Sequence, residues 1–186
     1  MKLNAFVFII ACATLFGCAR DKVTVQVVRH PLLKFNLNAN ASWTADNVAF
    51  GPISKVVVYP HDTINRAVVY NRLTLNSAGK ATSGENLQFI ISFDVIDAAE
   101  LKGKYTPLYS ITRGLAEVKI YDITNSNNLS AYSLCSANII KPQFQIDRQN
   151  SDERLISGIF QMTLCNERDS TQKVNVVNGT FTDIRY

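Results

Sequence analysis

Few side chains in this chain could do chemistry by themselves, and the first are four cysteines and two histidines among 186 residues. His30 and His61 each stand beside a proline, as expected in a linker or a loop. Neither a Cys-x-x-Cys nor a His-x-x-x-His pattern occurs, so the sequence offers no natural ligand set for zinc. We therefore predict no metal site and no catalytic role for either histidine.

Carboxylates are the other candidates, because a pair of them can hydrolyse a glycosidic bond. Most of the acids stand in expected turns or at strand ends, where solvated carboxylates are common, and no spacing in the sequence brings two together. We identify no catalytic residue and no cofactor, and keep a glycan-directed hydrolase as an alternative. The acids considered are Asp94, Asp97, Glu100, Glu117, Asp122, Asp147, Asp152, Glu153, Glu167, Asp169 and Asp183.

Aromatic side chains could form a surface on which sugar rings stack. Tyrosine is also a good strand residue, and most of these side chains fall within strand-like runs, so packing in the core or on a strand face is favoured. The residues concerned are Trp43, Tyr59, Tyr70, Tyr105, Tyr109, Tyr121 and Tyr132.

The first residues have the layout of a secretory signal peptide. Lys2 is followed by an apolar run from Leu3 to Phe16 that contains no charge. The run is shorter than the roughly 20 residues that a membrane-spanning helix needs. We expect residues 1–17 to be a signal peptide, residues 18–32 a linker, and residues 33–186 a single domain.

Leu15-Phe16-Gly17-Cys18 resembles the lipobox of bacterial lipoproteins, in which the cysteine becomes the first mature residue and carries acyl chains such as palmitate. The resemblance implies lipid attachment at Cys18, with Cys12 removed in the signal peptide. Several acyl chains anchor a protein firmly, since each buried CH₂ contributes roughly 0.8 kcal/mol. The expected location is the bacterial outer membrane, with its periplasmic face favoured over the cell surface.

The charge of the chain does not favour nucleic acid as a partner. The formal net charge is +4 over the whole chain. The positive residues are scattered, whereas a nucleic-acid site needs a basic patch or stripe.

The remainder of the chain is typical of an all-β domain. Short runs rich in β-branched and aromatic residues alternate with Asn, Gly, Ser, Asp and Pro, which predicts an antiparallel β-sandwich or partly open barrel of about 8–11 strands. One helical turn is expected at residues 97–103, closed by Gly103. The strand-like runs are 33–38, 42–50, 53–60, 66–75, 86–95, 104–111, 115–123, 129–140, 143–147, 154–165 and 173–181.

The last strands allow a register to be predicted. A hairpin centred near residue 150 would place Phe144 opposite Ile156, Ile140 opposite Phe160, and Leu134 near Leu164. On the same register Cys135 lies opposite Cys165, on the outer face of the sheet. Directly opposed residues are close enough for a disulfide after a small adjustment, so we predict one between these cysteines.

A second hairpin, turning at residues 166–171, would place Gly158 opposite Gly179 and Ile156 opposite Phe181. Two glycines on neighbouring strands would indicate a close approach or a bend of the sheet.

The segment "ISGIFQMTLCNERDSTQKVNVVNGTFTDIRY", residues 156–186, resembles the C-terminal pattern of small Bacteroidetes-type lipoproteins of unknown function. Gly103-x-Tyr105 matches a further step of that family, and residues 35–50 match its opening, although Asn38, Ala39 and Asn40 stand where the family usually has Gly. The resemblance implies an exported, lipid-anchored β-rich domain, and no activity. It implies a structural role, glycines at bends and aromatic rings in the core, for Gly103, Tyr105, Gly158, Phe160, Gly179 and Phe181.

Two short segments, Asp62-Thr63-Ile64 and Asp169-Ser170-Thr171, resemble Bacteroidetes O-glycosylation sites, which would place modified residues at Thr63 and Ser170. Taken together, the sequence predicts a membrane-anchored lipoprotein with a non-catalytic binding module for an envelope protein or a glycan. A hydrolase with paired carboxylates and a small-molecule carrier with a barrel cavity are the alternatives.

Overall fold

The structure is a computed structural model that describes residues 30–46, 48–61, 66–125, 129–135 and 141–186. Within these residues the fold is all-β, with eleven strands and no helix. The predicted fold class and strand number are therefore confirmed. The expected signal peptide, Cys18 and most of the linker lie outside the described residues, as do Thr63 and Ile140.

The strands form one antiparallel sheet that is not closed into a barrel. Along its main path the neighbours are β2-β1-β11-β10-β8-β7-β5-β4-β3, while β9 pairs with both β10 and β6. The strands are β1 (Leu32–Leu37), β2 (Ala41–Asp46), β3 (Ser54–Val58), β4 (Val68–Lys80), β5 (Asn86–Val95), β6 (Gly103–Tyr105), β7 (Arg113–Asp122), β8 (Ser130–Leu134), β9 (Gln143–Asn150), β10 (Leu155–Asn166) and β11 (Lys173–Arg185).

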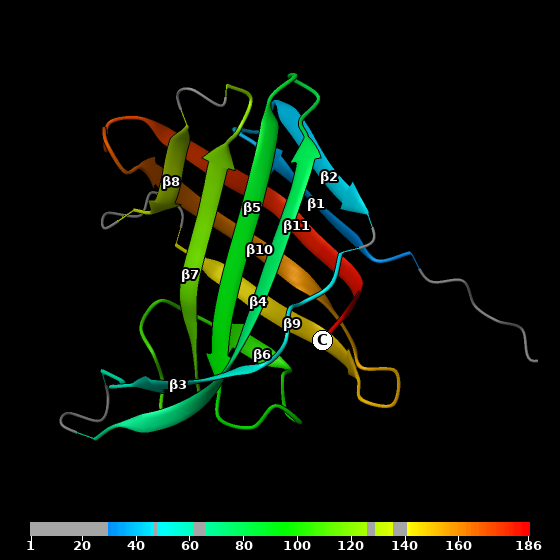
Figure 1. Cartoon of the computed structure of the whole chain (residues 1–186), viewed down its shortest axis with the longest axis vertical. Helices are drawn as coiled ribbons and strands as arrows, with labels where there is room; N and C mark the ends of the chain where they lie inside the picture. The colour runs from blue at the N-terminus through cyan, green and yellow to red at the C-terminus, as the bar shows by residue number, and fades with distance from the viewer. Residues whose placement is uncertain (1–29, 47, 62–65, 126–128, 136–140) are drawn as a thin grey trace, which may run out of the picture.

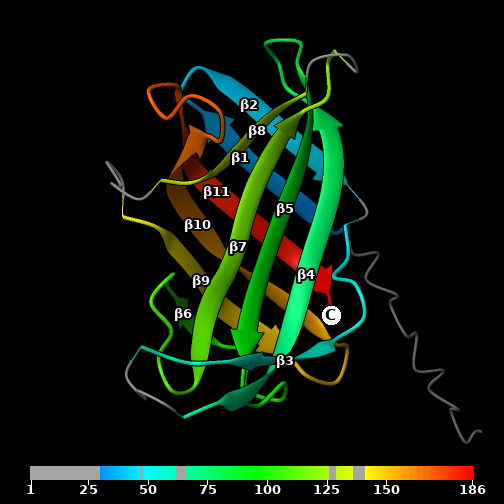
Figure 2. The same ribbon diagram turned by 60° about the vertical axis from the view of Figure 1, so that its left-hand side comes forward.

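The sheet folds over on itself into two layers. Strands β4, β5 and β7 stand upright in front of β9, β10, β11 and β1, which run diagonally behind them (Figures 1 and 2). The layers also touch along one side, because isolated bridges join Trp43 to Ala81 and Phe50 to Leu75. The architecture is therefore a partly open barrel, in which isolated bridges rather than a continuous ladder of hydrogen bonds join the two layers on this side.

Stacked aromatic rings fill the space between the layers. Phe35 stacks on Trp43 with ring centroids 4.8 Å apart, and Phe89 stacks on Phe160 at 5.5 Å. Further along, Phe144 stacks on Phe181 at 5.1 Å. These rings come from alternate positions of their strands, so the period-two pattern of the sequence places them all inward. Large packed rings stabilise the fold by burial and by their edge and face contacts.

The predicted register of the first hairpin is wrong in detail. Phe144 lies opposite Phe160, whereas Ile156 lies opposite Gln149. The tight turn comes after residue 150, because Asn150 already pairs with Leu155 and Arg154 takes a positive φ of 54°. Leu134 does lie opposite Leu164, as expected, because β8 and β9 pair with successive parts of β10.

The predicted pairing of Gly158 with Gly179 is also wrong. Gly158 lies opposite Phe181, and Gly179 lies opposite Phe160. The register shifts twice along this ladder, and β11 contains positive-φ residues at Asn178 and at Asp183. Such bulges add a residue to one strand, so counting outward from the turn misplaces every pair beyond them.

No helical turn forms at residues 97–103. The N–H of Glu100 donates to the carbonyl of Asp97 in a single tight turn, and the Asp97 side chain accepts from the N–H of Ala99 at 2.8 Å. Aspartate competes with helical hydrogen bonding in this way. Gly103 does not cap a helix but starts β6, with a φ of 147°.

Candidate functional site

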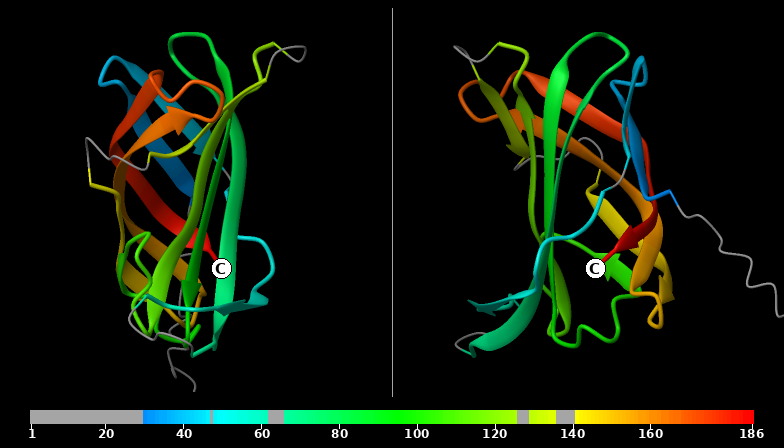
Figure 3. Two further views of the ribbon diagram at one scale, coloured as in Figure 1. Left: turned by 90° about the vertical axis from the view of Figure 1, so that its left-hand side faces the viewer. Right: turned by 45° about the vertical axis from the view of Figure 1, so that its right-hand side comes forward.

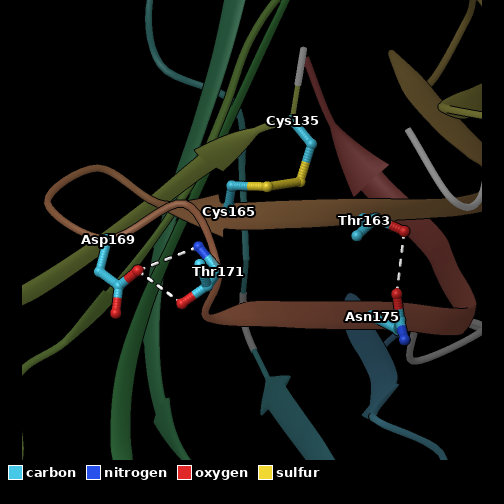
Figure 4. Close-up of a disulfide and its surroundings, with 6 residues drawn as sticks. All are labelled: Cys135, Thr163, Cys165, Asp169, Thr171 and Asn175. Carbon is cyan, nitrogen blue, oxygen red and sulfur yellow. Dashed lines mark hydrogen bonds between the residues drawn. A yellow bond between two sulfur atoms is a disulfide. The ribbon is translucent and has the colours of Figure 1, made fainter. Parts of the chain in front are cut away.

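The predicted disulfide between Cys135 and Cys165 is confirmed. The two sulfurs are 2.08 Å apart and the Cα atoms 5.0 Å apart (Figure 4). Cys165 pairs directly with Ser133, so Cys135 lies two residues beyond its direct partner, just past the end of β8. The N–H of Cys135 donates to the carbonyl of Thr163. The bond therefore runs diagonally and fastens the end of β8 to β10.

Ser170 lies exposed in the loop between β10 and β11. The carboxylate of the preceding Asp169 accepts hydrogen bonds from the N–H of Thr171 at 3.0 Å and from its hydroxyl at 2.6 Å (Figure 4). These bonds lower the pKa of Asp169. The hydroxyl of Thr171 is engaged in this turn, while O-glycosylation of Ser170 stays a prediction.

Asp94, one of the candidate acids, is fully buried in a polar clamp on the outer face of the front layer. Its carboxylate accepts two hydrogen bonds from the guanidinium of Arg72, at 2.7 and 2.8 Å, and one from the hydroxyl of Tyr109 at 2.5 Å. The bond to Asp94 raises the pKa of Arg72, and burial together with Asp94 raises the pKa of Tyr109. We assign Asp94 a structural role, because its oxygens are occupied and hidden from solvent.

The same clamp holds the loop of residues 106–112 against the sheet. The ring of Tyr109 meets the ring of Tyr70 edge-on at 5.6 Å, and the hydroxyl of Tyr70 donates to the carbonyl of Ser110 at 2.9 Å. Gly114 makes room for the ring of Tyr109, since a Cβ at that position would overlap it. The loop of residues 106–112 and the sheet beneath it are therefore held together by these contacts.

The β1–β2 turn, the β4–β5 hairpin and the β10–β11 loop lie at one end of the barrel (Figure 3). A pocket at this end is lined by residues of that turn and hairpin and by residues of β7, β8 and β11. We call it the open-end pocket. Its volume is about 280 Å³, and both layers contribute to it. Its apolar part consists of Leu37, Ala41, Leu87, Ile120 and Val174 with the ring of Tyr132.

Polar side chains of the β1–β2 turn, the β4–β5 hairpin and the end of β7 complete the open-end pocket. The N–H of Thr124 donates to Asp122 at 3.0 Å, and the N–H of Asn175 donates to the side-chain oxygen of Asn38 at 2.8 Å. These bonds orient two of the polar side chains. The polar lining residues are Asn38, Asn40, Ser83, Glu85 and Asp122.

The same end of the barrel holds an unpaired buried acceptor and an unpaired buried donor. Within the described residues, Oε2 of Glu85 and Nε1 of Trp43 are buried without a hydrogen-bond partner. Both residues neighbour Ala81: Trp43 is bridged to it, and the N–H of Ala81 donates to the carbonyl of Glu85 at 2.8 Å. An unpaired buried polar atom costs about 1–3 kcal/mol, so both atoms lower the stability of this end of the barrel.

The sequence did not single out Glu85. It stands in the segment "TSGEN", which has the composition of a turn. The one signal is its spacing of two residues from Leu87 and four from Phe89, which puts it in line with the inward-facing residues of β5, one residue before that strand begins. Asp122 was among the candidate acids, and Tyr132 among the candidate sugar-stacking residues, and the structure brings both to the open-end pocket.

The other aromatic candidates are distributed differently. Trp43, Tyr70 and Tyr105 are fully buried, whereas Tyr59 is 69% exposed near the β3 edge. His30 and His61 are exposed. Among the described residues, no group of three or more His, Cys, Asp or Glu side chains is arranged to hold a metal ion.

Comparisons of the chain with models of protein families, with curated proteins and with solved structures found no match. In the part of the chain that the structure describes, no helix has the length and apolar character needed to cross a membrane.

Proposed function

We propose that this protein is a lipoprotein of the bacterial outer membrane, acylated at Cys18, whose β-domain is a non-catalytic binding module for a glycan. The open-end pocket is the observation that carries the proposal. It combines an apolar surface with convergent polar side chains, which is the usual composition of a small-ligand site.

A sugar ring suits this lining. Hydroxyl groups can pair with the amide, hydroxyl and carboxylate groups of Asn38, Ser83 and Asp122, while the C–H face of the ring can pack on Tyr132 and Leu87. At about 280 Å³ the pocket is at the lower limit of ligand sites, which favours one or two sugar units over a large molecule.

The binding module is tested by screening the detergent-solubilised, full-length protein on a glycan array. A matched pair of variants locates the site: Ser83→Trp, at an exposed position of the β4–β5 hairpin, should fill the open-end pocket and abolish binding, whereas Val57→Trp, on the exposed edge strand β3, should leave it unchanged. Equal binding by both variants would move the site elsewhere.

The lipid anchor is tested by Cys18→Ser. The variant should lose its acyl chains and move to the aqueous phase of a detergent separation, because it lacks the thiol to which they attach. An acylated variant would contradict the lipobox interpretation. Protease treatment of intact cells tests the favoured periplasmic side, since a protein on that side should survive.

The alternatives differ in how well the described residues support them. A carrier needs an interior cavity, and the packed rings of Phe35, Phe89 and Phe160 occupy that space. A hydrolase finds support in one observation, the presence of Glu85 and Asp122 in the same pocket. Release of reducing sugar ends from a bound glycan, lost in Glu85→Gln, would favour the hydrolase over the binding module. An envelope-protein partner would instead be captured from cells by crosslinking.

A further inference from the structure

We infer that the domain docks onto an anionic lipid surface with the end of its barrel that lies opposite the open-end pocket. The docking surface is formed by β3, the start of β4 and the loop of residues 106–112, and we call it the lower end, after its place in Figure 2. The inference rests on the proposed lipid anchor, and it adds a second membrane contact that the folded domain makes itself.

Exposed apolar side chains are concentrated at the lower end. In the part of the chain that the structure describes, six of the nine large apolar side chains that are exposed belong to or border β3, the start of β4, the end of β5 or the 106–112 loop. Val57 is 63% exposed and Leu108 is 70% exposed. Large apolar patches on a soluble domain mark interaction sites. The six residues are Val57, Tyr59, Val69, Ile96, Leu108 and Ile111.

Contacts between the segments hold these side chains together at one end. Val57 lies directly opposite Val69 in the β3–β4 ladder, so both side chains are on the same face of the pair. The hydroxyl of Tyr70, the next residue of β4, donates to the carbonyl of Ser110 at 2.9 Å. The 106–112 loop is therefore fixed beside β4.

Basic side chains flank the apolar ones. Lys102 and Lys104 are exposed just before the 106–112 loop, and Arg113 follows it and donates to the carbonyl of Lys102. Lysine and arginine near an anionic membrane surface favour binding to it.

The acids of the same segments do not cancel this charge. Residues 53–72 and 94–113 contain six lysines and arginines and four acids. Asp94 is fully buried against Arg72, which leaves five basic residues and three acids for interaction with a partner. The basic residues are Lys55, Arg66, Lys102, Lys104 and Arg113, and the acids are Asp62, Asp97 and Glu100.

The arrangement favours a lipid surface over a protein strand. β3 is the last strand of the sheet, so its outer edge could instead accept a strand of another protein. Such a strand would cover β3 and leave Leu108 and Ile111 of the neighbouring loop in water. A lipid surface covers both segments at once, and Tyr59 is of a residue type enriched at membrane–water interfaces.

The start of the described chain lies at the same end of the barrel. Pro31 borders a hollow with Asp152 and Arg154 of the β9–β10 turn, and this turn lies at the lower end (Figure 2). The twelve residues from Cys18 to Arg29 span at most about 40 Å. A tether of this length raises the effective concentration of the lower end at the membrane, so a weak surface is sufficient for docking.

Quenching of tryptophan fluorescence by brominated acyl chains tests the inference. The acylated protein is reconstituted into vesicles of phosphatidylcholine and phosphatidylglycerol, with a tryptophan added by Tyr59→Trp or Leu108→Trp. We expect both probes to lose fluorescence when the acyl chains carry bromine. Ile123→Trp, exposed at the opposite end of the barrel, is the matched control and should keep its fluorescence. The parent protein measures the contribution of Trp43, which is fully buried.

Charge variants test the choice of an anionic surface. In the Tyr59→Trp protein, the added pair Lys102→Glu, Lys104→Glu should reduce quenching, and added salt should act in the same direction. The pair Lys80→Glu, Lys173→Glu, at exposed positions near the open-end pocket, is the matched control and should leave quenching unchanged. Thermal melts confirm that each variant is folded.

The outcomes separate this inference from the proposed anchor. Absence of quenching at both probes, in protein that still sediments with the vesicles, would overturn the docking and leave the anchor intact. Equal quenching of Ile123→Trp would overturn the choice of the lower end. Shielding of both probes from aqueous iodide without quenching by bromine would show that a protein, such as a second copy of the chain, covers this surface, and would overturn the lipid assignment. Protein that does not sediment with the vesicles would overturn the anchor and the docking together.

Discussion

Gly179 of β11 lies directly opposite Phe160 of β10, and the phenyl ring occupies the place of the side chain that Gly179 lacks. A Cβ built on Gly179 would lie 2.6 Å from Cδ2 of Phe160. Gly158 has the same relation to Phe181, whose Cζ would lie 2.5 Å from a Cβ on Gly158. In one pair the glycine is on β11 and the ring on β10, and in the other the glycine is on β10 and the ring on β11. Each glycine leaves the space that the ring opposite it occupies in the core.

Replacing either glycine with alanine should destabilise the protein. We expect Gly179→Ala to cost about 1–3 kcal/mol, because the ring must leave its position in a packed core. Gly158→Ala should cost more, because its methyl group would lie 2.0 Å from the backbone carbonyl oxygen of Gln145, whereas a Cβ on Gly179 would lie 2.6 Å from that of Phe160. Denaturant unfolding measures both effects.

Gly51→Ala is the control for this pair, since its Cβ would lie 3.6 Å from the nearest atom, the carbonyl oxygen of Thr74. It should change the free energy of unfolding by less than about 1 kcal/mol. A Gly179→Ala variant as stable as Gly51→Ala would contradict the packing argument.

The disulfide should contribute measurably to stability. It joins residues 30 apart in sequence, for which the chain-entropy estimate is roughly 3–4 kcal/mol. Removing it in the double variant Cys135→Ala, Cys165→Ala should lower Tm by about 2–4 °C for each kcal/mol lost. Reductant should lower the Tm of the parent protein and leave that of the double variant unchanged. An equal response of both proteins to reductant would show that the effect does not come from this bond.

Asp94→Asn should loosen the clamp on the 106–112 loop. Breaking a fully buried ion pair costs about 3–5 kcal/mol, and we expect about 2 kcal/mol here because the Arg72 side chain is 33% exposed. Lys104 and Arg113 flank the loop, so limited trypsin digestion should cleave the variant faster than the parent protein. Tyr109→Phe, which removes one hydrogen bond, should have a smaller effect of about 1 kcal/mol.

Stability should fall on the alkaline side. Tyr105 is fully buried with its hydroxyl donating to the carbonyl of Leu101, and burial raises the pKa of Tyr105 above its usual value. The unfolded chain releases this proton above pH about 10, while the folded protein retains it, so the free energy of unfolding should decrease by up to about 1.4 kcal/mol per pH unit there. Below that pH the contribution is fully present.

Comparison of the parent protein with Tyr105→Phe at rising pH isolates this contribution. The variant should show a shallower loss of stability above pH about 10, because it has one proton fewer to release on unfolding. Identical slopes for the two proteins would rule out Tyr105 as the source.

Ala39→Gly should stabilise the turn between β1 and β2. Asn38 and Ala39 have φ values of 49° and 64°, the left-handed conformation at both central positions of a tight hairpin turn. Alanine pays a steric cost there that glycine avoids, so we expect a gain of about 1 kcal/mol. Thermal unfolding would reveal it as a rise in Tm, and a fall would contradict the turn assignment.

The amino-acid sequence alone predicts those features of the fold that depend on the alternation of inward- and outward-facing residues along a strand. The inward positions of Phe89, Phe93 and Phe160 follow from period-two patterns, and these patterns also predicted the strand number. The disulfide was predicted as well, because Cys135 and Cys165 remain neighbours even when the register differs by two residues.

The remaining features depend on contacts between distant segments. The positive-φ positions Asn178 and Asp183 change the register of β11, and nothing nearby in the sequence announces the bulges. Asp94 meets Tyr109 only because a loop folds back over the sheet. Glu85 becomes a pocket residue only because the β1–β2 turn comes to lie near it.

The two ends of the short strand β1 lie beside different hollows of the surface. At its start, Pro31 borders a hollow formed with the β9–β10 turn, whereas Leu37 at its far end lines the open-end pocket. Six residues of strand span about 17–20 Å, which is the separation that β1 imposes between these places. His30 and Pro31, which precede β1, therefore lie at the end of the strand remote from the pocket. An anchor attached ahead of β1 would hold the domain by the end opposite the pocket, so a ligand would enter at the end farther from the point of attachment.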